Sequence, residues 1–322
     1  MENHSMRYLP QVVLILLAAT TWTAAVAESA EPGIRTVDKI TSDWNVRDHV
    51  PLDEFIVQSH RGAGKLEPEN TLRAFQLSWK MGTVPEADLR TTKDGVIVAF
   101  HDGNFKRLVK NASPELKKKS VSDLSWAEIQ TLDVGEGKGK EFIGCRIPSL
   151  DDILAQMIGH PKRRLYLDIK NIELGRLAKK VAAANVESQV ILASTDYALI
   201  RKWKRLTPKS GTLLWMGGSE KVLAERIAEL RRTNFADIVQ LQIHVVTEET
   251  NRGKKISPSA SFLVETGKEL RRHGILYQAL PWHRSDAQVY WQLMDLGVAS
   301  FASDYPDKTM EAIRQYYMRR TR

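Results

Sequence analysis

Within residues 60–102, two histidines and two of the carboxylates each stand at or just after an apolar run that predicts a strand. They are His60, Glu86, Asp88 and His101. A histidine can give or accept a proton near neutral pH, and carboxylates bind hard divalent cations. These residue types predict metal-assisted acid–base chemistry, in which one histidine protonates a leaving alcohol and the other takes a proton from the nucleophile.

A third carboxylate repeats the spacing of the first two. Glu86 and Asp88 stand two residues apart on a predicted strand, so both side chains share one face, and their repulsion favours a cation between them. Asp168 and Lys170 have the same spacing at the end of a later apolar run. We expect Asp168 to complete an oxygen-only site for Mg2+ or Ca2+, and Lys170 to contact a phosphate oxygen. A solvent-facing acidic pair and a salt bridge at the rim are the simpler alternatives.

Further residues could line the same site. Arg61 follows the first histidine and offers a planar fork for phosphate oxygens, in a loop that Gly62 and Gly64 keep free of Cβ atoms. His244, on a predicted strand, could face the same site or serve as a buried structural residue. Trp282 could line the site as well, with packing in the core as its alternative.

A regular alternation of strands and helices would bring these residues together. Eight apolar runs predict strands, and amphipathic stretches lie between them. The runs cover residues 55–57, 84–90, 164–169, 190–193, 212–215, 238–245, 275–279 and 298–301. Eight such units favour the α/β class and a single-domain (β/α)8 barrel, with catalytic residues at the carboxyl ends of its strands. A doubly wound open sheet is the alternative, but no G-x-G-x-x-G follows any predicted strand.

Capping residues mark several helix boundaries. Asn70 predicts the N-cap of a helix over residues 71–80, which Gly82 would end. Ser125 and Ser149 each begin a capping box, since an acidic residue follows three positions later in both cases. The helix over residues 71–80 would directly follow the loop that carries His60.

The beginning of the chain has the pattern of a secretory signal. A short apolar run precedes the A-x-A cleavage pattern Ala25-Val26-Ala27. We expect residues 1–27 to be a signal peptide, 28–50 an N-terminal linker and 51–318 the barrel. An uncleaved membrane anchor is the alternative, although the run is shorter than the about 20 residues of a span. The signal and the single cysteine, Cys145, favour an exported protein in a bacterial periplasm or outside the cell.

The chain carries an excess of basic residues. It has 47 Lys and Arg against 39 Asp and Glu, which gives a formal net charge of +8 at pH 7. The excess is spread over several short clusters without a nucleic-acid-binding motif, so we expect no nucleic-acid partner. A positive field would raise the local concentration of an anionic phosphate ester and would allow transient contact with an anionic membrane surface.

Several short motifs follow one another in a fixed order along the chain. They are His60-Arg61-Gly62, Pro68-Glu69-Asn70-Thr71, Glu86-x-Asp88, Thr92-Lys93-Asp94-Gly95, His101-Asp102, Asp168-Ile169-Lys170 and Ser303-Asp304-Tyr305-Pro306. Together they resemble the glycerophosphodiester phosphodiesterase family, over roughly residues 56–307. The resemblance implies a TIM barrel with its site at the C-terminal mouth. It also implies a small-molecule glycerophosphodiester as substrate, which is hydrolysed to glycerol 3-phosphate and an alcohol.

The resemblance implies roles for the histidines His60 and His101, the three carboxylates, Arg61 and Lys170. It also adds Glu69, which would support the site or approach the metal. The matching positions hold one divalent cation, Ca2+ or Mg2+, through three carboxylates: Glu86, Asp88 and Asp168. The positions of His60 and His101 are the acid and the base. Those of Arg61 and Lys170 contact the phosphate. In the usual mechanism the glycerol 2-hydroxyl attacks phosphorus, and water then opens the cyclic phosphate.

Two positions depart from the family pattern. Asp168 stands where the family usually has glutamate, so the side chain that carries this carboxylate is shorter by one methylene. Residues 277–281 replace a Trp-Thr-Val-Asn pattern, and Trp282 could supply the missing aromatic wall. These departures keep two alternatives open: phospholipase D-like action on lysophospholipids, and a non-catalytic barrel that binds phosphate esters.

Overall fold

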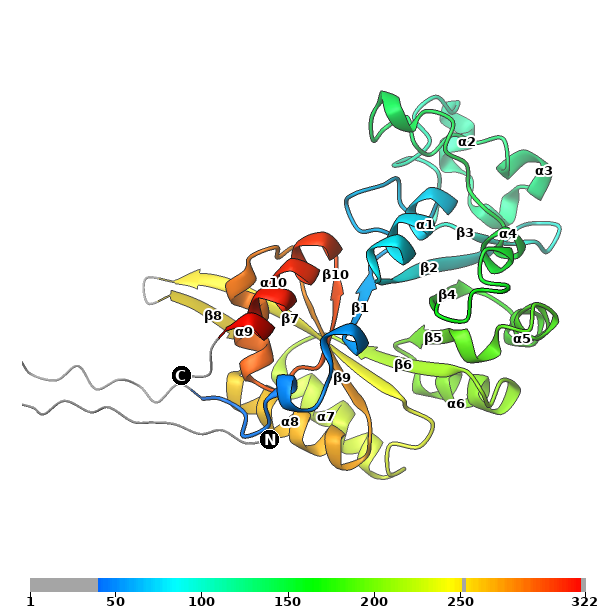
Figure 1. The fold of residues 1–322 in the computed structure, drawn as a ribbon. Helices are drawn as coiled ribbons and strands as arrows, with labels where there is room; N and C mark the ends of the chain where they lie inside the picture. Colours follow the sequence, from blue (N-terminus) through cyan, green and yellow to red (C-terminus); the bar gives the residue numbers. More distant parts are fainter. Residues whose placement is uncertain (1–39, 251–252, 320–322) are drawn as a thin grey trace, which may run out of the picture. The chain divides into compact units, whose positions relative to one another are not determined.

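Eight strands of the described chain run parallel to one another and close into a barrel (Figure 1). The computed structural model describes residues 40–250 and 253–319. The barrel strands are β1 (Ile56–Ser59), β2 (Val84–Thr91), β4 (Leu165–Asn171), β5 (Val190–Ser194), β6 (Gly211–Met216), β7 (Gln240–Thr250), β9 (Leu276–Pro281) and β10 (Ser300–Ser303). Since β1 pairs with both β10 and β2, the ring is closed. The predicted (β/α)8 TIM barrel of the α/β class is confirmed.

Two further strands extend the sheet without joining the ring. β3 (Ile97–Ala99) pairs antiparallel with the end of β2. β8 (Gly253–Ser257) forms an antiparallel hairpin with the second half of β7. The sequence did not predict this hairpin, and β7 is therefore longer than the apolar run that marks its barrel portion.

Helices follow the barrel strands and cover the outside of the ring (Figure 1). They are α1 (Leu72–Met81), α4 (Leu150–Ala155), α5 (Leu174–Ala183), α6 (Tyr197–Leu206), α7 (Glu220–Arg231), α8 (Ala260–Arg272), α9 (Ala287–Asp295) and α10 (Pro306–Met318). Single 3-10 turns are η1 (Val46–Asp48), η2 (Leu52–Glu54), η3 (Val121–Asp123), η4 (Lys140–Phe142) and η5 (Glu187–Gln189). Side chains cap several helices at their first N–H groups, as Asp196, Ser219 and Ser259 do.

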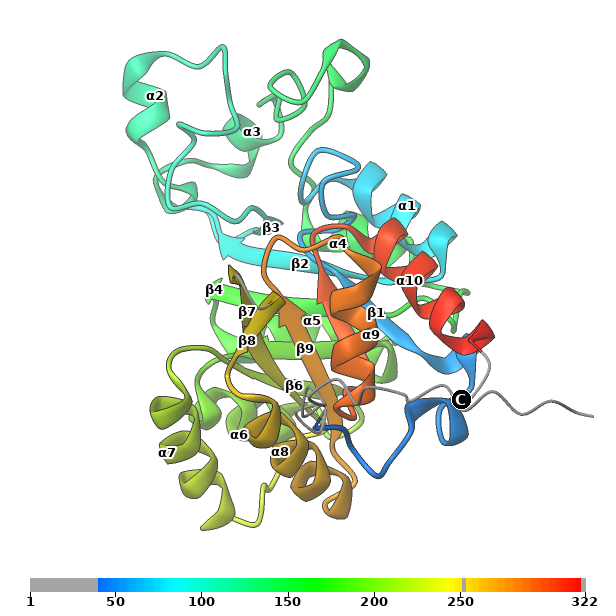
Figure 2. The ribbon, with the colours of Figure 1, turned by 90° about the vertical axis from the view of Figure 1, so that its left-hand side faces the viewer.

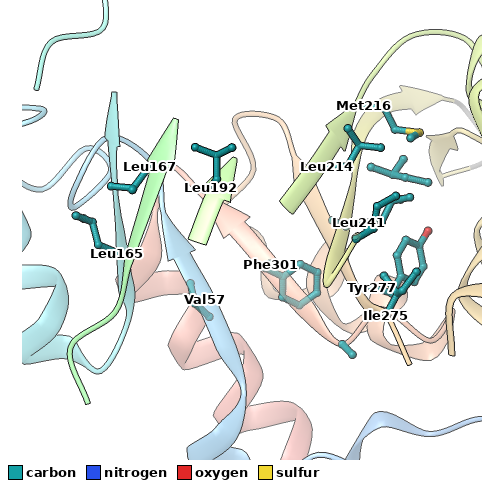
Figure 3. Packing of buried hydrophobic residues seen from close by; sticks show 14 of the residues in the cluster. Val57, Leu165, Leu167, Leu192, Leu214, Met216, Leu241, Ile275, Tyr277 and Phe301 are labelled. Atoms are coloured by element: carbon teal, nitrogen blue, oxygen red, sulfur yellow. The ribbon is translucent and has the colours of Figure 1, made fainter. Parts of the chain in front are cut away.

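Strand residues alternate between two environments, as the period of two requires. Leu165 and Leu167 of β4 belong to the large cluster that joins the sheet to its helices, and Figure 3 shows them beside Leu192 of the next strand. Tyr166, between them, is fully buried in a smaller cluster with Ile191 and other residues of neighbouring strands. The apolar runs are therefore continuous because both faces of these strands are covered.

The interior of the barrel also holds a layer of buried glutamines. Tyr166 donates a hydrogen bond of 2.7 Å to Gln240, and Gln278 donates one of 2.9 Å to Ser300. Gln242 donates to Gln278 on the next strand, so the layer is internally hydrogen-bonded. Because buried amides cost free energy unless they are paired, these bonds make a polar interior tolerable.

An insertion separates β3 from α4. It contains α2 (Pro114–Lys118) and α3 (Trp126–Ile129), and it packs around a hydrophobic cluster that includes Phe105 and Leu124. In Figure 2, α2 and α3 stand apart from the helices that cover the barrel. The predicted single barrel thus carries an appendage with its own small core.

The N-terminal boundary of the folded part differs from the predicted one. The expected signal peptide, residues 1–27, lies outside the described residues, as do residues 28–39 of the expected linker. Residues 40–50 include η1, whose Val46 is fully buried in the main core. The predicted linker of residues 28–50 is therefore too long at its C-terminal end. None of the helices that the structure describes is long and apolar enough to cross a membrane.

Candidate active site

The three predicted carboxylates come together inside the barrel. Glu86 and Asp88 lie on β2, and Asp168 lies on β4, directly beside Asp88 in the parallel register. One oxygen from each lies within 4.8 Å of the others. All three side chains are buried, with Asp168 the most exposed at 8 %. The sequence spacing predicts that Glu86 and Asp88 share one face of β2. The register between β2 and β4 places Asp168 beside them.

This cluster concentrates negative charge in a buried place. Burial, followed by the charge of Glu86, raises the pKa of Asp168 to about 7. Burial also raises the pKa of Glu86, although the charge of His60 opposes it. Lys170 Nζ lies 2.7 Å from Asp168 Oδ2 and 3.1 Å from Asp88 Oδ1, so it compensates part of this charge. Its place beside two carboxylates also fits the simpler salt-bridge alternative.

His60 directly follows β1, and a carboxylate from the last strand holds its ring. Nδ1 lies 2.7 Å from Asp304 Oδ1, and Nε2 lies 4.0 Å from Glu86 Oε2. Burial lowers the pKa of His60, but the hydrogen bond to Asp304 and the charge of Glu86 outweigh it, so its pKa is raised. Asp304 also contacts Nδ1 of His283 at 3.1 Å.

An aspartate also orients the ring of His101. Its Nδ1 lies 2.9 Å from Asp102 Oδ1, and its Nε2 lies 3.0 Å from Nη2 of Arg61. Since an arginine can only donate, Nε2 accepts and the proton of a neutral ring sits on Nδ1. Burial raises the pKa of Asp102, but the bonds from Arg107 and His101 outweigh it and lower this pKa to about 2. Arg90 fixes the backbone here by donating to the carbonyl of His101 at 2.7 Å.

Glu69 supports the site from outside the metal cluster. Arg61 Nη1 lies 3.2 Å from its Oε1, and Arg107 donates to both of its oxygens at 2.6 and 2.7 Å. Two guanidinium groups therefore engage this carboxylate, which lies outside the carboxylate triplet. Of its two expected roles, support of the site is the one that this geometry fits.

Asn70 does not cap the first helix, contrary to the prediction. Thr71 does so, with its hydroxyl accepting from the N–H of Ala74, and Gly82 ends the helix in the left-handed conformation. Asn70 itself has φ 56°, which asparagine tolerates better than most residues. Its amide accepts from the N–H of Asp88 at 2.9 Å and donates to Oδ2 of Asp88 at 2.8 Å. Asn70 is therefore a positioning residue for one of the carboxylates.

Two tryptophan rings lie on the side of the site where His60 and His244 stand. The Trp282 ring is 6.0 Å from the ring of His60 and 5.1 Å from that of His244. Trp215 stacks on His244 at 5.0 Å with an interplanar angle of 8°. Burial lowers the pKa of His244 to about 4, so its ring is neutral near pH 7. Trp282 and His244 thus both lie beside His60, on the aromatic side of the site.

Sequence reasoning gave no role to several residues that the structure brings into the site. Asp304, Asp102, Arg107 and Arg90 orient or support the histidines. For Asp304 a signal was present, because it lies shortly after the last predicted strand, residues 298–301, within a recognised motif. Arg107 lies in the insertion, where no periodic pattern marks its position.

A parallel barrel that gathers carboxylates and histidines near the carboxyl ends of its strands defines a TIM-barrel enzyme site. Residues 60–308 match the glycerophosphoryl diester phosphodiesterase family, and the chain belongs to it. The chain is 33 % identical over 172 residues to a glycerophosphodiester phosphodiesterase of Caldanaerobacter subterraneus, over 50 % of this chain and 68 % of that protein.

Solved structures agree with this assignment. A structure from Silicibacter pomeroyi, described as a glycerophosphoryl diester phosphodiesterase, superposes with a TM-score of 0.65 at 20 % identity, covering 81 % of this chain and 93 % of that one. An Oleispira antarctica phosphodiesterase in complex with the product sn-glycerol-3-phosphate superposes with a TM-score of 0.59 at 25 % identity, covering 84 % and 100 %. The resemblance inferred from the motifs is confirmed.

Proposed function

We propose that this protein hydrolyses glycerophosphodiesters to glycerol 3-phosphate and an alcohol, with a divalent cation and two histidines. The observation that carries the proposal is the carboxylate triplet of Glu86, Asp88 and Asp168 beside two histidines, each held by an aspartate. The family and the product seen in the Oleispira antarctica structure support the same reaction class.

The residues of the triplet fit a hard divalent cation such as Ca2+ or Mg2+. All its donors are oxygens. Burial, followed by the charge of Glu86, raises the pKa of Asp168 although Lys170 lies beside it, and a bound cation would offset both effects. Glu86, Asp88 and Asp168 would hold the cation. Bound there, it would supply Lewis acidity at a phosphoryl oxygen.

Arg61 is suited to hold the phosphate. Its side chain is half-buried, and its Nε is buried without a hydrogen-bond partner among the described residues. A buried donor without a partner is costly, and a phosphate oxygen would satisfy it. Lys170 on β4 would add a point charge.

The two histidines can run both halves of the reaction. In the first half, one takes the proton of the glycerol 2-hydroxyl as this oxygen bonds to phosphorus, and the other protonates the departing alcohol. The products are the free alcohol and a cyclic phosphate. In the second half the proton transfers run in reverse, so that water opens the ring to glycerol 3-phosphate. Asp304 and Asp102 keep each ring in one orientation throughout.

Release of glycerol 3-phosphate from glycerophosphocholine tests the proposal, first in EDTA and then with Ca2+ or Mg2+ added back. We expect release only with metal, and its loss in His60→Ala and in His101→Ala. His160→Ala is the matched control, because His160 is exposed and precedes the amino end of β4, whereas the site lies toward the carboxyl ends of the strands. Metal-independent release would contradict the role of the triplet. Release of lysophosphatidic acid from a lysophospholipid alone would indicate the phospholipase D-like alternative, and binding without turnover the non-catalytic barrel.

We also propose that the chain is exported, on the strength of its N-terminal pattern alone. The apolar run and the Ala25-Val26-Ala27 motif support cleavage after Ala27. Expression in a bacterium followed by N-terminal sequencing of the periplasmic fraction tests this. A mature protein that begins at Glu28 is expected, and retention of residues 1–27 in a membrane fraction would indicate the anchor instead.

A further inference from the structure

A cavity that the proposed reaction does not use lies between the loop after β1 and the insertion. Its volume is about 320 Å3. Lys65, Glu69, Arg107, Lys110 and Lys138 are among its lining residues. The loop contributes the first two of these side chains, and the insertion contributes the other three.

The charge of this cavity is positive. Its two acidic residues are already paired, because Glu67 binds Arg73 and Glu69 binds Arg107. Its lysines are not paired in this way: none of the three has a carboxylate partner among the residues that the structure describes. Lys65 donates to the hydroxyl of Tyr305 at 2.7 Å, and the Lys138 ammonium donates to a backbone carbonyl.

The insertion holds two of these lysines close together. The side chain of Lys110 lies against Gly137, where a Cβ atom would come within 2.7 Å of Lys110 Cε. Gly137 directly precedes Lys138, and all three residues line the cavity. Like charges held near each other favour an anion between them.

The cavity shares a wall with the active site. Glu69 and Arg107 line it, and the same two side chains contact Arg61 and Asp102, which in turn contact His101. A group in the cavity is therefore separated by one layer of side chains from the proposed phosphate contact. This adjacency is the basis for assigning the cavity to a second substituent of the same substrate molecule.

We propose that this cavity binds a second anionic group, a carboxylate or phosphate, carried by the alcohol of the phosphodiester. The inference rests on the proposed function and names its preferred substrates: glycerophosphodiesters with an anionic headgroup. Lys110 and Lys138 supply the attraction, and Lys65 adds to it from the loop.

Two substrates that differ by one carboxylate test the proposal. Glycerophosphoserine carries this carboxylate and glycerophosphoethanolamine lacks it. We expect the ratio of their kcat/KM values to be above one in the wild-type enzyme with Ca2+ or Mg2+. The ratio should fall about tenfold in Lys110→Gln/Lys138→Gln, since each exposed lysine contributes a factor of about three. Lys117→Gln/Lys118→Gln is the matched control, because it removes the same charge from the same insertion outside the cavity.

A ratio at or below one in the wild type, or an unchanged ratio in Lys110→Gln/Lys138→Gln, would overturn the proposal. Turnover of neither substrate would contradict the proposed function, and calorimetric titration with both compounds then decides the cavity separately. Tighter binding of glycerophosphoserine that is weakened in Lys110→Gln/Lys138→Gln supports the anion site. Equal binding by the wild type and this variant would refute it.

Discussion

Asp304 Oδ1 lies 2.7 Å from Nδ1 of His60, although 244 residues separate the two in the chain. The contact exists because β10 pairs with β1 and closes the barrel, so the ends of its first and last strands are neighbours. Asp304 thereby fixes the His60 ring with Nε2 on the side of Glu86. Closure of the barrel therefore also orients the histidine that we propose for catalysis.

The first prediction concerns this carboxylate. Asp304→Asn removes the charge that holds His60, so burial lowers the pKa of the histidine with less opposition and its tautomer is no longer fixed. We expect kcat to fall about 100-fold or more with little change in KM, as for other aspartates that orient a catalytic histidine. Asp307→Asn, three residues further on in α10, should leave both constants unchanged. Equal kcat values for Asp304→Asn and the wild type would remove Asp304 from the mechanism.

The second prediction concerns the metal. A cation that binds only the folded state raises its stability, by about 2.7 kcal/mol at a concentration 100-fold above Kd. Ca2+ or Mg2+ should therefore raise the Tm of the wild type and fail to do so in Asp88→Asn. Asp168→Glu, which restores the residue usual in the family, should keep the rise. Asp151→Asn serves as the control, since Asp151 lies on α4 and pairs with Lys180. A rise in Tm that persists in Asp88→Asn would show that the cation binds elsewhere.

Local patterns in the sequence predicted the elements and part of the site. The eight strands were visible because both faces of most of them are covered, which makes runs such as residues 190–193 apolar on both faces. The shared face of Glu86 and Asp88 followed from the strand period alone. That Asp168 stands directly beside Asp88 depends on the register between β2 and β4, which no single segment encodes.

Residues whose roles depend on distant partners were beyond such reasoning. Asn70 has the residue type and position of a helix cap, and only the approach of β2 shows that its amide binds Asp88 instead. Glu69 was assigned two possible roles, and the choice between them required Arg107 of the insertion. The β7–β8 hairpin was missed because its sequence is mostly polar. Thr247 and Ile256 are buried, but two such residues are too few to form an apolar run.

The third prediction is a pH dependence of stability. Burial lowers the pKa of His244 to about 4, whereas an unfolded histidine titrates near 6.5. Between these values the unfolded state binds the proton more readily, so the folded state loses stability as pH falls from about 6.5 to 4. Replacing the residue in His244→Asn should remove up to about 3 kcal/mol of this acid sensitivity.

Denaturant unfolding of the wild type and His244→Asn at a series of pH values measures this difference. The raised pKa of His60 acts in the opposite direction, because its stabilisation is present below pH 6.5 and is lost at higher pH. Since both proteins contain His60, its contribution cancels in the comparison. Parallel stability curves for the two proteins would mean that His244 is protonated as readily in the fold as in the unfolded chain.

The fourth prediction concerns the loop that carries His60. Gly64 has φ +59°, and a Cβ atom there would lie 2.2 Å from the carbonyl oxygen of Asp304. The same carbonyl accepts from the N–H of Lys65 at 2.8 Å, so the loop and the end of β10 are tightly joined. Gly64→Ala must therefore displace the backbone of Asp304, and with it the carboxylate that orients His60. We expect a drop in kcat of at least about tenfold, because a misplaced catalytic group is costly, and a lower Tm.

Gly274→Ala is the control for Gly64→Ala. It carries the same unfavourable backbone conformation without displacing Asp304. Gly274 has a similar φ of +67°, but nothing lies within 4 Å of the Cβ atom that alanine would add. Both variants bear the strain of a left-handed residue, about 1–2 kcal/mol, and both should lose stability for that reason. Only Gly64→Ala should also lose kcat at a temperature where both proteins are folded. An equal loss of kcat in both variants would assign the effect to stability, and the join between the loop and Asp304 would then have no part in catalysis.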